Sequence, residues 1–287
     1  MNENGNFVAL LGTKGGPAIR PGSAMPTSSL LCLGGRKIVI DSGLGVARAL
    51  TRQGMALRDL DLIFITHLHS DHYLELGPLL HTAWTAGLKT RVMVHGPAGL
   101  SHYWEHFLES MRFDIELRME DEGRPDLREL VEIHVIEEGD VMRDGGLAVR
   151  AMRNEHPPLR DTFALSVEAC ETRIVFSGDT AYLPALVPFA QGADLLVHEA
   201  MLEDALEALF ARIGNGDDRL KAHWMRAHTL AADAGKLATA ANVKALALHH
   251  LIPSDDPAFT PEHWLAAVRP HWSGTLHIAT DGLRIAI

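Results

Sequence analysis

One short stretch, LDLIFITHLHSDHYLEL at residues 60–76, constrains this chain more than any other. Its apolar part, LIFI at 62–65, is rich in β-branched and aromatic residues and predicts a buried strand that stops at Thr66. Four side chains that can bind metals follow within six residues: His67, His69, Asp71 and His72. A loop held by a rigid strand can turn several side chains toward one point. Because imidazole and carboxylate groups are ligands of zinc and similar cations, the stretch predicts a metal site.

The same placement of a polar residue directly after an apolar strand recurs along the chain. His156 follows LAVRAMR and precedes a Pro-Pro turn, and Asp179 follows RIVFS beside a glycine that leaves room for a close approach. Later strands end in His198-Glu199 and in His249-His250. Repetition of this placement predicts a site built on one edge of a sheet.

Length and charge limit the possible partners. The 287 residues, 47% of them hydrophobic, can bury one large core or two modest ones. A net charge of −11 repels polyanions and argues against a stable nucleic-acid partner. A small anionic ester remains compatible, since metal ions would meet its charge. The N-terminal run MNENGNFVALLG has no basic leader and no apolar run reaches membrane length, so we expect a cytoplasmic protein without a membrane partner.

Other segments give expectations about local structure. Residues 28–40 predict a hairpin with a Gly34-Gly35 turn, and residues 113–120, FDIELRME, predict a strand. Cys32 and Cys170 lie in apolar, strand-like surroundings and are predicted to be buried structural thiols.

Two features near the predicted site have two interpretations each. Asp41, at the end of the strand IVI, either orients a ligand histidine or caps the next helix. The loop at 14–27, rich in Gly, Pro and Ser, either borders the site or is an ordinary surface crossing.

Taken together, these motifs resemble the metallo-β-lactamase fold superfamily over nearly the whole chain, and within it the ribonuclease Z and arylsulfatase-like branch. The stretches that carry the resemblance are LGTKGGP, IVIDSGLG, THLHSDH, VHGPAGL, FSGDT, LLVHEA, AHTLAADAG and LALHHLIP. The resemblance implies an α/β fold, a four-layer αββα sandwich, formed by one domain over residues 1–287.

The resemblance also implies two divalent metal ions, preferably Zn²⁺, with Mn²⁺ or Fe as alternatives. One ion would be held by His67, His69 and His156, the other by Asp71, His72 and His250, with Asp179 bridging both. Asp71 therefore counts in both the metal and the catalytic sets. His250 is preferred to His249 because LALHHLIP fits the family pattern best that way, and alternating strand side chains allow only one of them to face the site. A hydroxide held between the metals would attack the substrate.

Glu199 and His228 resemble a pair that assists the leaving group in ribonuclease Z-like enzymes. A carboxylate that orients an imidazole and stabilises its protonated form creates a general acid. The alternative is that His228 simply begins the Ala-rich helix predicted at 229–241.

The chain departs from ribonuclease Z in its insertions. Only 22 residues separate His156 from Asp179, which leaves no room for the long arm that grips tRNA in that family. Extra length lies instead at 201–227. Its apolar residues at helical spacing, which predict either core packing or a helical cap over the metals, are Leu202, Leu206, Leu209, Phe210 and Ile213.

The main hypothesis is a metal-dependent hydrolase of a small anionic ester, either a phosphodiester or an aryl sulfate. Its partner would be a small-molecule substrate, and the resemblance allows a homodimer. The alternatives are a lactonase or β-lactam hydrolase, a ribonuclease Z-like tRNA 3′ endonuclease, and a non-catalytic binding module that keeps the fold as a scaffold.

Overall fold

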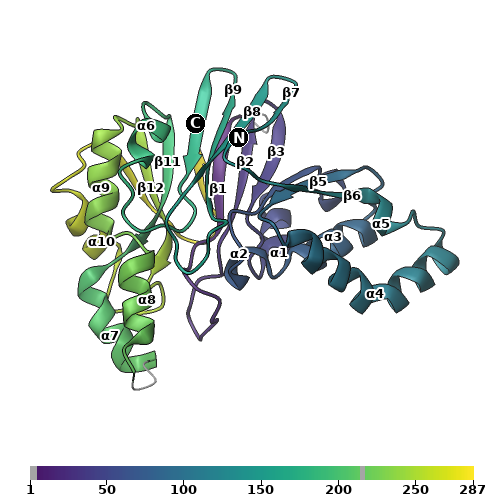
Figure 1. Cartoon of the computed structure of the whole chain (residues 1–287), viewed down its shortest axis with the longest axis horizontal. Helices are drawn as coiled ribbons and strands as arrows, with labels where there is room; N and C mark the ends of the chain where they lie inside the picture. Colours follow the sequence, from purple (N-terminus) through teal and green to yellow (C-terminus); the bar gives the residue numbers. More distant parts are fainter. Residues whose placement is uncertain (1–4, 214–216) are drawn as a thin grey trace.

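Two mixed β-sheets form the centre of the molecule (Figure 1). The computed structural model describes residues 5–213 and 217–287, without the side chains of Glu207 and Ile213. Within this part of the chain, the first sheet has the order β14 (Leu283–Ala286), β1 (Phe7–Gly12), β2 (Ser28–Leu33), β3 (Arg36–Ile40), β4 (Leu62–Phe64), β5 (Val92–Gly96) and β6 (Val131–Val135). The second has the order β13 (Thr275–Ile278), β12 (Ala245–Ile252), β11 (Leu195–Met201), β10 (Thr172–Phe176), β9 (Phe163–Ala169), β8 (Leu147–Arg153) and β7 (Gly139–Asp144).

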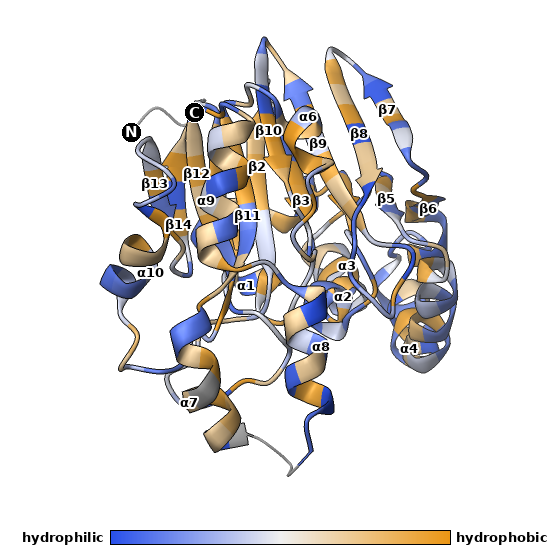
Figure 2. Ribbon diagram, turned by 60° about the vertical axis from the view of Figure 1, so that its left-hand side comes forward, coloured by the Kyte–Doolittle hydropathy of each residue, from blue (hydrophilic) through white to orange (hydrophobic). Residues whose placement is uncertain are grey.

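Helices cover the outer face of each sheet, on opposite sides of the molecule in Figure 1. The helical elements that alternate with the strands of the first sheet along the chain are α1 (Val46–Arg52), a 3₁₀ turn (Leu57–Asp59), α2 (Ser70–Tyr73), α3 (Leu76–Thr85), α4 (Leu100–Glu122) and α5 (Leu127–Leu130). The second sheet is covered by α6 (Leu186–Ala190), α9 (Ala231–Ala240) and α10 (Pro261–Val268). Two further helices, α7 (Glu203–Ile213) and α8 (Arg219–Ala227), lie below the sheets in Figures 1 and 2.

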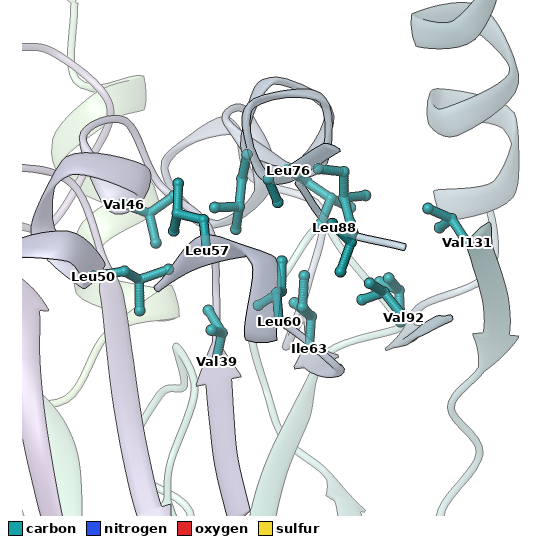
Figure 3. Close-up of a cluster of buried hydrophobic side chains, with 14 of the residues drawn as sticks. Val39, Val46, Leu50, Leu57, Leu60, Ile63, Leu76, Leu88, Val92 and Val131 are labelled. Carbon is teal, nitrogen blue, oxygen red and sulfur yellow. The ribbon is translucent and has the colours of Figure 1, made fainter. Parts of the chain in front are cut away.

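Separate apolar clusters fill the spaces between these layers. One lies between the sheets and includes Leu10 and Phe64 from the first sheet and Val167 from the second. A second joins the first sheet to its helices; Figure 3 shows Val39 and Ile63 from the strands below Leu76. A third joins the second sheet to α6, α9 and α10. Three buried interfaces between four layers confirm the predicted αββα sandwich.

Strands inside each sheet, such as β1 and β11, are buried on both faces, which explains their long hydrophobic runs. All six residues of β1, FVALLG, are buried. Val8 and Leu10 face the second sheet, whereas Ala9 and Leu11 face the helices. In Figure 2, apolar colour accordingly runs along most of β2, whereas β7 at the edge of the second sheet carries hydrophilic segments.

The prediction of a strand at 113–120 is wrong, because this segment is the second half of helix α4. Alternating Phe113, Ile115 and Leu117 suggested one apolar strand face. Only Ile115 is buried; Phe113 is 82% exposed and Leu117 is 50% exposed. The packed residues instead recur every four positions, at Met111, Ile115 and Met119, which is the helical repeat.

The predicted Gly34-Gly35 turn and the predicted burial of the two cysteines have different outcomes. Gly34 and Gly35 both have positive φ, 58° and 80°, and confirm the predicted turn between β2 and β3. Cys32 is half-buried, but Cys170 is exposed in the turn between β9 and β10, so its predicted burial is wrong. A turn places a residue at the surface even where its neighbours in the sequence are apolar.

None of the described helices is both long enough and apolar enough to cross a membrane.

The helix-facing core offers a direct test of the layer arrangement. Leu80 of α3 is fully buried, whereas Leu117 of α4 is 50% exposed. We expect Leu80→Ala to lower the free energy of unfolding by about 2–5 kcal/mol because it leaves a cavity. Leu117→Ala is expected to change it by about 0.5 kcal/mol or less. Urea denaturation of both variants measures the difference, and equal losses would contradict the packing described.

Candidate metal centre

The predicted strand ends meet at one edge of the two sheets. Strands β10, β11 and β12 are parallel neighbours, so their carboxyl ends bring Asp179, Glu199 and His250 to the same edge. Strand β8 runs in the same direction, because it and β10 are both antiparallel to β9. It delivers His156 from the loop after its end. The first sheet contributes the segment after β4, where α2 carries Asp71 and His72.

Asp179 lies at the centre of the resulting cluster. Its Oδ2 atom is 3.6 Å from Nε2 of His67, 3.4 Å from Nε2 of His72, 3.8 Å from Nε2 of His156 and 3.0 Å from Nε2 of His250. One carboxylate therefore faces imidazoles from both sheets, the position that a bridging ligand occupies between two metals.

Three groups of candidate donor atoms include or adjoin this carboxylate. The donor atoms within each group lie within 4.8 Å of one another. The first group is His67, His69, His156 and Asp179, the second is Asp71, His72 and His250, and the third, which shares residues with both, is Asp179, His228 and His250. His69 joins the first group through Nδ1, which is 2.9 Å from Nε2 of His156. Asp71 joins the second through Oδ2, 3.3 Å from Nε2 of His250. The structure thus brings together all seven residues predicted from the sequence.

Hydrogen bonds behind the cluster fix which nitrogen of each ring faces it. Nδ1 of His72 is 2.8 Å from Oδ2 of Asp41, and Nδ1 of His156 is 2.8 Å from the carbonyl oxygen of Ala227. Each ring therefore turns Nε2 inward. Helix α1 is preceded by Gly45 and has no side-chain cap. The interpretation of Asp41 as a residue that orients a histidine is confirmed, and the capping alternative is wrong.

The donor set fits divalent cations. Nε2 of His72 and Oδ1 of Asp179 are buried and lack a hydrogen-bond partner among the described residues. Burial lowers the pKa of His156 to about 4, which keeps its imidazole neutral as a metal requires. Burial also opposes protonation of His250, yet the neighbouring Asp179 and Asp71 carboxylates raise its pKa to about 10. Carboxylates that need a buried positive charge, with neutral imidazoles beside them, are the environment of a dinuclear metal site.

A β-bulge decides which of the two adjacent histidines faces the cluster. Glu199 of β11 pairs with His249, but the next residue pairs with Leu251, so His250 is the extra residue. Its φ of +45° is unusual for a residue other than glycine. His249 instead points away and lies 2.9 Å, through Nε2, from the carbonyl oxygen of Gly12. Burial lowers the pKa of His249 to about 3.

Glu199 and His228 form a buried pair beside the cluster. Oε1 of Glu199 is 3.0 Å from Nδ1 of His228 and also accepts the backbone N–H of Thr180 at 2.8 Å. The ring of His228 stacks on that of His250, with 5.5 Å between centroids. Helix α9 begins only at Ala231, so His228 is not its first residue.

A glycine allows Asp179 to reach the centre. Gly178 has a φ of +58°, and a Cβ atom there would lie 2.6 Å from the carbonyl oxygen of Phe163. Only glycine avoids both the strain and the clash. The predicted close approach of the backbone at this position is confirmed.

The cluster opens into a pocket with a volume of about 330 Å³. The loop after β1 borders it, as one interpretation of residues 14–27 predicted, and contributes Lys14 and Arg20. Helices α7 and α8 form the opposite wall, with Leu209, His223 and Trp224 among the lining residues. In Figure 1, this loop after β1 is the purple segment drawn between α8 and α2.

Described residues of segment 201–227 pack in a core and also line the pocket. Leu206 and Leu209 pack with Met201 and Ile252 in a small core of their own. Helix α8 meanwhile places His223 with its ring 6.0 Å from that of His156. Sequence analysis missed His223, Lys14 and Arg20 as site residues. The motif GTKGGPAIR and the position of His223 five residues before His228 were the available signals.

The fold and the cluster together define a metallo-hydrolase of the metallo-β-lactamase fold. Residues 8–229 match the family model of the anti-Pycsar protein Apyc1. Ribonuclease Z of Mycobacterium sp. (strain KMS) is 30% identical over 284 residues, covering 98% of this chain and 95% of that protein. Ribonuclease Z of Mycobacterium bovis (strain BCG / Pasteur 1173P2) is 28% identical over 283 residues, 98% of each chain.

Solved structures agree on the fold. The metallo-β-lactamase fold protein YhfI from Bacillus subtilis aligns with a TM-score of 0.71 at 19% identity, over 98% of this chain and 99% of that one. The short form of human tRNase Z aligns with a TM-score of 0.67 at 21% identity, over 98% and 99%. The chain therefore belongs to the metallo-β-lactamase fold superfamily, in the branch that contains ribonuclease Z and the anti-Pycsar protein Apyc1. Proteins of this family are metal-dependent hydrolases.

The orientation of the two adjacent histidines predicts opposite effects on metal binding. We expect His250→Gln to lower the metal content of purified protein from about two ions per chain toward one, because it removes a donor from the second group. His249→Gln should leave the content unchanged, since its ring faces Gly12. Elemental analysis measures both, with circular dichroism as the check on folding. Equal metal loss in the two variants would contradict the orientation.

Proposed function

We propose that this protein hydrolyses a small anionic ester, with a phosphodiester or an aryl sulfate as substrate, by means of two divalent metal ions. The observation that carries the proposal is the Glu199–His228 pair, which is buried, hydrogen-bonded at 3.0 Å and adjacent to the donor cluster. An imidazole held by a carboxylate at the edge of a pocket is suited to protonate a departing oxygen.

The proposed ligand assignment follows the first two donor groups, whereas His228 of the third group is proposed as the proton donor. His67, His69 and His156 would hold one ion, Asp71, His72 and His250 the other, and Asp179 both. Zinc is the proposed metal because histidine nitrogen and carboxylate oxygen suit it well, although manganese and iron accept the same donors. When bound, two such ions supply a hydroxide from water at neutral pH and stabilise negative charge on the ester.

The residues of the chain supply the remaining steps. His228 lines the pocket, and its Nδ1 is occupied by Glu199, which leaves Nε2 as the proton donor. Glu199 holds the ring in place through its contact with Nδ1. Helices α7 and α8 reduce access of water from one side, because Leu209, Leu220 and Trp224 form an apolar wall there.

The size and lining of the pocket favour a small substrate. A volume of about 330 Å³ is at the low end of the range for small-molecule sites, roughly 300–1,000 Å³. The apolar wall suits an aromatic or aliphatic group, and Lys14 and Arg20 suit a negative charge. A lactone or β-lactam would use the same centre, but its ring opening has less need of a proton donor placed like His228.

Cleavage of tRNA precursors at the 3′ side is the second candidate, favoured by the relatives named ribonuclease Z. These relatives align over 95–98% of their length, so the short β9–β10 hairpin does not separate this chain from them. The net charge of −11 argues against a polyanionic substrate. We expect no cleavage of a tRNA precursor under conditions in which bis(p-nitrophenyl) phosphate is hydrolysed. Processing at the 3′ side would establish the second candidate instead.

The role of His228 predicts a specific dependence on the leaving group. Aryl methyl phosphodiesters with leaving phenols of decreasing acidity increasingly need a proton donor. We therefore expect His228→Ala to reduce kcat about 10²- to 10⁴-fold for the least acidic phenol and about 10-fold or less for p-nitrophenol. Steady-state kinetics across the series measures this slope.

A matched control is His81→Ala. His81 is also paired with a carboxylate, at 2.9 Å from Asp114, but it lies on α3 outside the pocket. The control should hydrolyse every ester of the series at the rate of the wild type.

A uniform loss of kcat across the series in His228→Ala would assign His228 a structural role. Turnover restricted to a lactone and indifferent to His228 would favour the lactonase alternative.

A further inference from the structure

Lys14 is an unusual residue in the pocket because its side chain is almost completely buried. Only 5% of the residue is exposed. Its backbone is fixed by bridges to Pro26 and to Leu251, next to His250 in β12. The following glycine pair turns the chain across the pocket, and the N–H of Gly16 donates to Oδ2 of Asp71 at 2.8 Å. Lys14 therefore lies on a loop that is tied directly to the donor cluster.

The ammonium group of Lys14 has only neutral partners. Nζ donates to the carbonyl oxygens of Gly15 at 2.8 Å and Gly16 at 3.2 Å. Among the described residues, no carboxylate lies within ion-pair distance of it. Burial lowers the pKa of Lys14, while Asp255 and Asp71 act in the opposite direction from farther away. Since a buried charge without a counter-charge is costly, a negatively charged ligand would stabilise this group.

The other cation of the pocket is already paired. Arg20 lies 3.2 Å from Asp255, and its side chain is 37% exposed. The same carboxylate also binds Arg212 of α7 at 3.3 Å. Arg20 thus helps to join the loop after β1 to the cap, and its charge is screened by both Asp255 and solvent.

We propose that Lys14 is a specificity-determining residue that binds a negatively charged oxygen of the substrate and so selects anionic over neutral esters. The inference rests on the proposed function, because it names the charge that the pocket recognises. A Lys14 ammonium with two protons on backbone carbonyls retains a third for this oxygen. The metals would offset the Asp71 and Asp179 carboxylates, which leaves Lys14 as additional positive charge beside them.

The first test measures binding rather than turnover. Inorganic phosphate is titrated calorimetrically into metal-loaded wild type, Lys14→Met and Lys236→Met. Methionine keeps most of the length of the side chain and removes the charge. We expect Lys14→Met to weaken phosphate binding about 10- to 100-fold, the effect of losing one charge-assisted hydrogen bond. Lys236→Met is the matched control, because Lys236 lies on α9 outside the pocket with its side chain 49% exposed, and it should change affinity about threefold or less.

The second test compares charged with neutral substrates. For Lys14→Met we expect KM for bis(p-nitrophenyl) phosphate to rise by a similar factor with little change in kcat, and hydrolysis of a neutral p-nitrophenyl ester to stay as in the wild type. Metal content and melting temperature are measured for every variant.

The outcomes separate the inference from the proposed function. Unchanged phosphate affinity in Lys14→Met, no phosphate binding by the wild type, or equal losses on charged and neutral substrates would each overturn the role of Lys14. Loss of metal from Lys14→Met would also overturn this role, since it would show that the lysine supports metal binding by Asp71 rather than contacting the substrate. If the wild type cleaves neither diesters nor sulfates, the proposed function fails, while the phosphate titration still decides the role of Lys14.

Discussion

The carboxylate of Asp179 is the contact on which the rest of the site depends. It is buried at the end of β10, and its Oδ2 lies within 3.8 Å of imidazoles from both sheets and from the loop after β8. Burying a carboxylate destabilises the folded state unless positive charge surrounds it. The two sheets must therefore pack so that their carboxyl ends meet, and this requirement links the stability of the sandwich to the assembly of its centre.

Backbone features at the edge of the sheets make that meeting possible. Gly178 lets the chain approach Phe163 closely, and the bulge in β12 turns His250 inward. In the loop after β1, the carbonyl oxygen of Thr13 accepts the N–H of Leu251 at 2.8 Å, and the N–H of Gly15 donates to the carbonyl oxygen of Leu251 at 3.1 Å, directly after the bulge. The loop that carries Lys14 is thus held by the same strand that presents a donor histidine. Substrate recognition and the donor cluster consequently share one support.

Helices α7 and α8 add shape to this charged centre. Leu206 and Leu209 of α7 pack on Met201 and Ile252 at the ends of β11 and β12, so α7 is anchored to the strands that carry Glu199 and His250. Helix α8 presents Trp224 and His223 to the pocket. The chemistry proposed for the protein comes from the sandwich, whereas the pocket beside it is lined by these helices and by the loop after β1.

The sequence by itself determined the elements that have local signals. Apolar runs marked the strands and their polar ends marked the edge of the sheet that carries the site. The motif THLHSDH indicated the superfamily, and that resemblance implied all seven cluster residues. Local signals failed where two periods fit one segment, as at 113–120, where alternation suggested a strand and the packing required a helix. Tertiary structure alone decided that Lys14, Arg20 and His223 share a pocket and that a bulge turns His250 to the centre. These features depend on contacts between residues far apart in the chain, which local patterns such as GTKGGPAIR do not specify.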